Sequence, residues 1–69
     1  MLTRIAVNVK PAMDRRTGQR LRQLLVAMPG VKQVTIAYPN RVEVQYDEAE
    51  ASASGFLTVI RTHGLRTGL

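Results

Sequence analysis

Apolar and polar residues alternate in two parts of the chain, and this alternation predicts β-strands. Residues 3–9 alternate until Pro11, and residues 31–46 alternate on both sides of the turn signal Pro39-Asn40. Successive side chains of a strand point to opposite faces, so one face of each segment is expected to be buried. The apolar positions expected on that face are Ile5, Val7, Val9, Val34, Ile36, Tyr38, Val42, Val44 and Tyr46. We therefore predict one strand and, later in the chain, a β-hairpin.

Residues 15–28 have the spacing of an amphipathic helix. The residues on its inner arc, which spans about 100°, are Thr17, Leu21, Leu24, Leu25 and Met28. Asp14 stands at the N-cap position, and Pro29-Gly30 ends the helix. Two features of the first turn are unfavourable. A pair of arginines lies at the positive end of the helix dipole, and Gly18 costs about 1 kcal/mol relative to alanine.

A second helix is expected after Ser52, which is a suitable N-cap, and it ends at His63 before Gly64. Its inner face consists of Phe56, Val59 and Ile60. Residues 65–69 are expected to form a short final strand or a frayed end. The order β-α-β-β-α-β predicts an α+β, ferredoxin-like two-layer sandwich, with an antiparallel four-stranded sheet and two helices on one face.

The composition is that of one small globular domain, which we place at residues 1–69. The absence of cysteine excludes a disulfide framework, a thiolate metal site and a cysteine nucleophile. No apolar run has the length of a signal peptide or a membrane span, so a cytoplasmic location is expected, including the cytosolic end of a membrane protein.

Four segments carry a resemblance to a known family. They are Val9, Gly30-Val31, Val42-Glu43-Val44-Gln45-Tyr46-Asp47 and Ile60-Arg61-Thr62-His63-Gly64. At these positions the chain resembles the heavy-metal-associated, copper-chaperone-like domain, and the match covers nearly the whole chain. The resemblance implies the ferredoxin-like fold, a role in metal traffic, and a metal loop between the first strand and the first helix.

The metal loop itself departs from the family pattern. In the family's register its Gly-Met pair becomes Pro11-Ala12, and its two cysteine positions become Asp14 and Thr17. A carboxylate and a hydroxyl are hard donors that suit copper(I) poorly, and the neighbouring arginines repel cations. We therefore expect thiolate metal binding to be lost, with Asp14 acting as an N-cap and Thr17 as a helix residue.

A harder divalent metal ion has three candidate ligands, which are Asp14, His63 and Met13. In the family, the loop after the second helix approaches the metal loop, which would bring His63 near the other two. A lone histidine at a helix C-terminus is more often a surface residue that complements the helix dipole. No metal or other cofactor is therefore expected.

Catalysis and sheet-based RNA recognition find no support in the sequence. There is no nucleophile–base–acid arrangement and no glycine-rich phosphate loop, so an enzyme is not expected. RNA-binding versions of this fold stack bases on aromatic side chains of the open sheet face. The residues expected there are Arg4, Ala6, Asn8, Arg41, Glu43 and Gln45, and none is aromatic.

Basic residues gather in the first part of the chain, where residues 1–41 contain eight lysines and arginines against one acid. In the family, basic residues around the metal loop complement an acidic partner domain. The corresponding residues, here called the basic patch, are Lys10, Arg15, Arg16, Arg20 and Arg22. The resemblance thus implies docking to an acidic protein surface, such as a metal-transporting ATPase domain. The alternative is a generic module for anionic ligands or nucleic acid.

Overall fold

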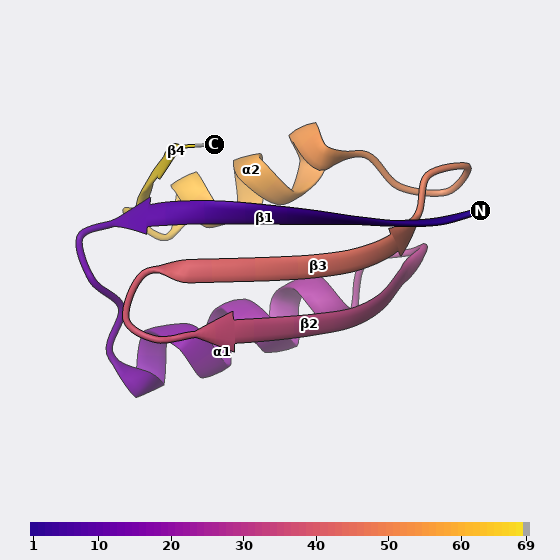
Figure 1. The fold of residues 1–69 in the computed structure, drawn as a ribbon. Helices are drawn as coiled ribbons and strands as arrows, with labels where there is room; N and C mark the ends of the chain where they lie inside the picture. The colour runs from indigo at the N-terminus through magenta and orange to yellow at the C-terminus, as the bar shows by residue number, and fades with distance from the viewer. Residues whose placement is uncertain (69) are drawn as a thin grey trace.

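The computed structural model describes residues 1–68, and its elements follow in the predicted β-α-β-β-α-β order (Figure 1). They are β1 (Leu2–Lys10), α1 (Arg15–Val26), β2 (Val31–Ala37), β3 (Arg41–Asp47), α2 (Ala53–Thr62) and β4 (Arg66–Gly68). The predicted final strand extended to Leu69, which lies outside the described residues. No helix among residues 1–68 is long and apolar enough to cross a membrane.

The strands form one antiparallel sheet in the order β2-β3-β1-β4. Both helices cover the same face of this sheet, so the opposite face is open (Figure 1). This is the ferredoxin-like sandwich that the sequence predicted. β1 lies between β3 and β4 in this sheet. The chain runs from the C-terminal end of β1 into the loop before α1, where the family resemblance placed the metal.

The core lies between the sheet and the helices. Its fully buried side chains are Val7, Val9, Leu21, Leu25, Val42, Val44, Phe56 and Ile60. The ring of Phe56 meets that of Tyr46 edge to face, with centroids 4.8 Å apart. The strand positions predicted to face inward on β1 and β3 therefore do so, because the alternation of each strand fixes which side chains meet the helices.

Two predicted core positions are wrong. Leu24 is 41% exposed, because α1 turns the side that carries Gly18 and Leu25 towards the sheet and leaves Leu24 at the margin. Tyr38 is 36% exposed, since it follows the end of β2 and packs only against the first turn of α1, at Gly18. The helix also ends two residues earlier than predicted, with Ala27 as its C-cap.

Of the two predicted ends of α2, the C-terminal one at Gly64 is confirmed, whereas Ser52 occupies the N-cap position without forming the capping hydrogen bond. Gly64 has φ +82°, as expected for the residue that ends α2. Ser52 occupies the N-cap position of α2, but its hydroxyl lies 3.1 Å from that of Ser54 and does not cap the helix.

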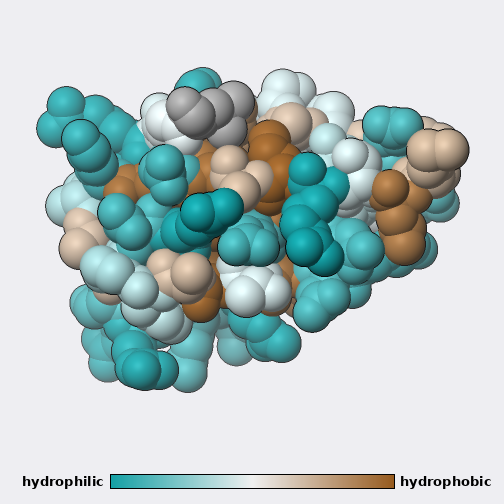
Figure 2. All heavy atoms as spheres, viewed as in Figure 1, coloured by the Kyte–Doolittle hydropathy of each residue, from teal (hydrophilic) through white to brown (hydrophobic). Residues whose placement is uncertain are grey.

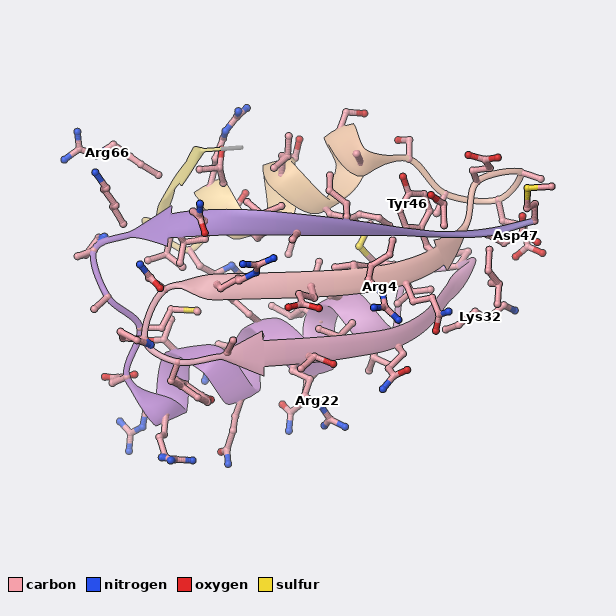
Figure 3. The ribbon with its side chains drawn as sticks, in the orientation of Figure 1. Arg4, Arg22, Lys32, Tyr46, Asp47 and Arg66 are labelled. Atoms are coloured by element: carbon pink, nitrogen blue, oxygen red, sulfur yellow. The ribbon has the colours of Figure 1, made fainter. Side chains whose placement is uncertain are left out.

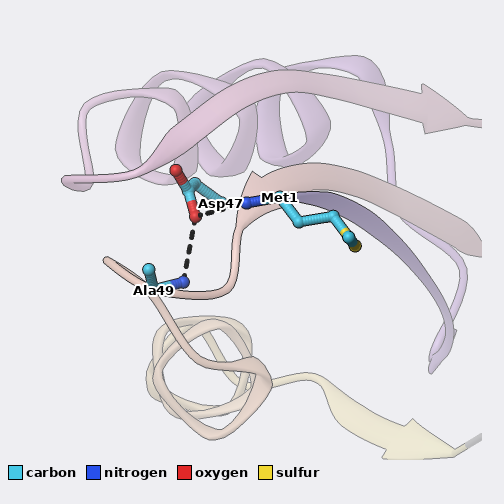
Figure 4. A network of polar contacts seen from close by, with 3 residues as sticks. All are labelled: Met1, Asp47 and Ala49. Carbon is cyan, nitrogen blue, oxygen red and sulfur yellow. Dashed lines mark hydrogen bonds and ion pairs between the residues drawn. The ribbon is translucent and has the colours of Figure 1, made fainter.

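Asp47 organises the end of the sheet opposite the metal-loop position (Figure 4). Its Oδ1 accepts hydrogen bonds from the Ala49 amide at 3.0 Å and from the Met1 amine at 3.3 Å. The Ala49 amide, followed by the Met1 amine and the charge of Lys32, lowers the pKa of the Asp47 carboxyl.

Candidate functional site

The loop between β1 and α1 is held by contacts within the chain. Met13 is 4% exposed and belongs to the core, and its amide donates to the Pro39 carbonyl oxygen at 2.6 Å. Asp14 caps α1, because its Oδ1 accepts from the Thr17 amide at 2.7 Å. The two residues at the family's cysteine positions are thus joined to each other by a helix cap.

The cap changes the acidity of Asp14. The hydrogen bond from the Thr17 amide, with a smaller contribution from the charge of Arg16, lowers the pKa of the Asp14 carboxyl. Both effects favour the ionised form. The cap also places one negative charge at the positive end of the helix dipole, where two arginines stand.

We expect this cap to be lost in acid. A carboxyl whose pKa is depressed in the folded state stabilises the fold above its unfolded pKa, and this contribution disappears as pH falls through the folded pKa. Urea unfolding of Asp14→Asn should therefore show a smaller loss of stability between about pH 4 and about pH 2 than the parent protein does. Asparagine also caps helices, so the variant should remain folded. Equal losses in both proteins would contradict the role of the Asp14 charge.

The three candidate metal ligands are each engaged elsewhere. Met13 is in the core, and Asp14 caps α1. His63, at the C-cap of α2, donates through Nδ1 to the Val59 carbonyl oxygen at 3.0 Å, which leaves only Nε2 with a free lone pair. Within residues 1–68 no three histidine or acidic side chains are grouped as metal ligands, and the whole sequence lacks cysteine. This donor set does not fit a soft thiophilic ion.

The basic patch has no internal counter-charge. Within residues 1–68 the ion pairs join Met1 to Asp47 and Arg41 to Glu43, so none involves the patch. All five patch residues are exposed. At 100° per residue from the buried Gly18, Leu21 and Leu25, Arg16 points away from the sheet and Arg20 lies on the outer side of the helix. Arg15 and Arg22 share the opposite flank of α1. Figure 3 shows Arg22 extending from α1 at the edge of the molecule opposite Arg66.

Sequence reasoning missed the role of Tyr38. Its hydroxyl donates to the Arg15 carbonyl oxygen at 3.3 Å, and the Arg15 guanidinium carbon lies 5.1 Å from the ring centroid. A Cβ at Gly18 would lie 2.6 Å from the ring atom Cε1 of Tyr38, so only glycine leaves room for this ring. The unfavourable Gly18 in the first turn of the helix was the one signal of this contact in the sequence.

The open face of the sheet is covered mostly by hydrophilic side chains, with hydrophobic residues visible between them (Figure 2). A shallow hollow of about 100 Å³ lies there, lined by Arg4, Gln33, Thr35, Glu43 and Gln45. The six residues predicted for this face alternate with the buried ones on β1 and β3, and none is aromatic. This face therefore has no stacking platform for bases among the described residues.

Solved structures share this architecture along the whole chain. The CsoZ metallochaperone is 20% identical, with 100% of both chains covered and a TM-score of 0.90. Oxidized MerP from Ralstonia metallidurans CH34 is 13% identical over 99% of this chain and 96% of its own, with a TM-score of 0.86. A copper binding domain from HMA7, a P-type ATPase, is 20% identical over 99% and 92%, with a TM-score of 0.85.

Neither a protein-family model nor a curated protein matches the sequence. The solved structures extend over nearly the full length of the chain, and they establish its fold. The protein thus has the fold of metallochaperones and heavy-metal-associated domains, without the cysteine pair of the metal loop.

Proposed function

We propose that this protein is a non-catalytic, metallochaperone-like domain that docks to an acidic protein surface through its basic patch. The observation that carries the proposal is the set of exposed, unpaired basic residues on α1 and at the end of β1. Unpaired like charges on one surface steer an oppositely charged partner and raise the rate of encounter.

The fold supports a role in metal traffic, although in this chain the loop before α1 caps a helix and carries no cysteine ligands. Solved proteins with this fold include a metallochaperone and a copper binding domain of a P-type ATPase. In this chain Asp14 caps the helix at a position where the family pattern has a cysteine. The domain would therefore act as a docking or regulatory module on the cytoplasmic side, beside a metal-transporting ATPase or a related protein.

Charge reversal of the patch tests the proposal. The probe is a synthetic 12-residue peptide of alternating glutamate and serine, and binding is followed by NMR shifts at increasing salt. Arg16→Glu combined with Arg20→Glu should weaken binding at least about tenfold, and the parent's affinity should fall with salt.

The matched control reverses two exposed charges outside the patch, at Arg4 on the open sheet face and at Lys32 near the start of β2. Both variants have the same net charge, so the control should weaken binding much less if the patch is the contact surface. Equal losses would overturn the assignment of the patch. Tighter binding to a generic single-stranded 12-mer oligonucleotide than to the acidic peptide would favour the nucleic-acid alternative.

A further inference from the structure

Two loops meet at the patch end of the molecule. The Met13 amide donates to the Pro39 carbonyl oxygen at 2.6 Å, and the Val9 amide donates to the Asn40 carbonyl oxygen at 2.8 Å. The loop after β1 is thereby fastened to the turn between β2 and β3. Four exposed residues with apolar side chains or rings lie within two positions of the Met13–Pro39 bond, and we call them the apolar tip: Pro11, Ala12, Tyr38 and Pro39.

Tyr38 is fixed within this tip. Its hydroxyl is bonded to the Arg15 backbone, the Arg15 guanidinium lies over its ring, and Gly18 provides the space beneath it. The side chain nevertheless remains 36% exposed. Because the ring is already held in one place, little side-chain conformational entropy of Tyr38 is lost when a partner binds to it.

Charges surround the tip closely. Lys10 directly precedes it, and Arg15 and Arg16 follow within the first turn of α1. Arg22 is six residues beyond Arg16, which is about 9 Å further along the helix. An apolar centre with a charged rim is the usual anatomy of a protein interface, and tyrosine and arginine are the residues most often found at its energetic centre.

We propose that the apolar tip is the anchor of the docking surface, and that it accepts an apolar side chain flanked by carboxylates on the partner. This inference rests on the proposed function and makes it more specific. Each contact that forms the tip lies within the chain, so the anchor is present without a metal ion. The carboxylates pair with the basic rim while the apolar side chain packs on Tyr38.

Two peptides separate the anchor from simple charge attraction. One is the glutamate–serine 12-mer, and the other is identical except for a leucine in place of a central serine. The parent protein should bind the leucine peptide about fivefold more tightly, which is in the range of a single well-packed interface contact. The advantage should disappear in Ala12→Gln, which covers the tip, and in Gly18→Ala, which displaces the Tyr38 ring.

Matched variants at other sites serve as controls. Ala27→Gln makes the same change at an exposed alanine at the far end of α1, and Gly55→Ala adds a Cβ that would lie 3.4 Å from the Met28 Cε, an ordinary van der Waals contact. Both should keep the leucine advantage. Arg16→Ala should weaken both peptides more than Arg22→Ala does, although each removes one charge.

The outcomes distinguish the two levels of the proposal. If both peptides bind equally well to the parent, the anchor is overturned while docking by charge stands. If neither peptide binds, the proposed function fails and the anchor with it. Should Gly18→Ala not fold, as judged by its NMR spectrum, Ala12→Gln decides the question, because it removes no internal contact of the described residues.

Discussion

Replacing Leu21 by alanine is expected to destabilise the domain by about 2–5 kcal/mol, whereas the same change at Leu24 should cost less than about 1 kcal/mol. The Leu21 side chain is 0% exposed beneath the sheet, and Leu24, one turn further along the same helix, is 41% exposed. Truncation at Leu21 removes apolar burial and leaves a cavity, but truncation at Leu24 exchanges one exposed side chain for another.

Urea unfolding at neutral pH measures both values. Domains have about 0.05–0.15 kcal/mol of stability per residue, so Leu21→Ala should leave a considerable fraction of the molecules unfolded at room temperature. Leu24→Ala is the matched control, because it has the same chemistry and the same helix propensity change. Similar costs at the two positions would contradict the orientation of α1 described above.

This pair of leucines also shows how far the sequence could predict the fold. The helical spacing correctly grouped Leu21, Leu24 and Leu25 on one side of a helix, but periodicity does not give the centre of the buried arc. That centre depends on how α1 packs against β2. The buried Gly18 shows that the helix is rotated away from Leu24. The strands were easier to predict, because alternation has only two possible faces.

The candidate site was predictable where it depends on local chemistry. Asp14 as an N-cap follows from its position before a helix, and the hydrogen bond to the Thr17 amide confirms it. Tyr38 was not predictable in this way, since the residue it contacts, Arg15, is 23 positions distant in the sequence. Only Gly18 gave a signal, and an unfavourable glycine does not identify the side chain that needs its space.

The first turn of α1 combines several locally unfavourable choices at one end of the molecule. Arg15 and Arg16 oppose the helix dipole, and Gly18 weakens the helix. Residues that break local rules often mark functional sites. Here the glycine accommodates the Tyr38 ring, and the arginines remain unpaired within the described residues. The end of the fold that holds metal in the family pattern would then present charge and a fixed aromatic ring.

Gly30→Ala is expected to lower the free energy of unfolding by about 2–5 kcal/mol, because both its backbone conformation and its surroundings disfavour a side chain. Gly30 has φ +85°, a region that disfavours side chains by about 1–2 kcal/mol. Its added Cβ would also lie 2.7 Å from the Glu50 Cβ and 3.2 Å from the Glu50 carbonyl carbon. These atoms cannot easily move aside, since the Asp47 amide bonds the Gly30 carbonyl oxygen at 2.8 Å and fastens the two segments together.

Gly64→Ala separates the two penalties. Gly64 has nearly the same backbone angle, φ +82°, but no atom lies within 4 Å of its added Cβ. This variant should cost only about 1–2 kcal/mol, the penalty of the backbone conformation alone. The difference in unfolding free energy between the two variants then measures how tightly the start of β2 is packed against the loop after β3. If the two alanine variants are equally stable, the loop after β3 moves aside at no measurable cost in unfolding free energy. The close approach of Gly30 to Glu50 then contributes nothing to stability.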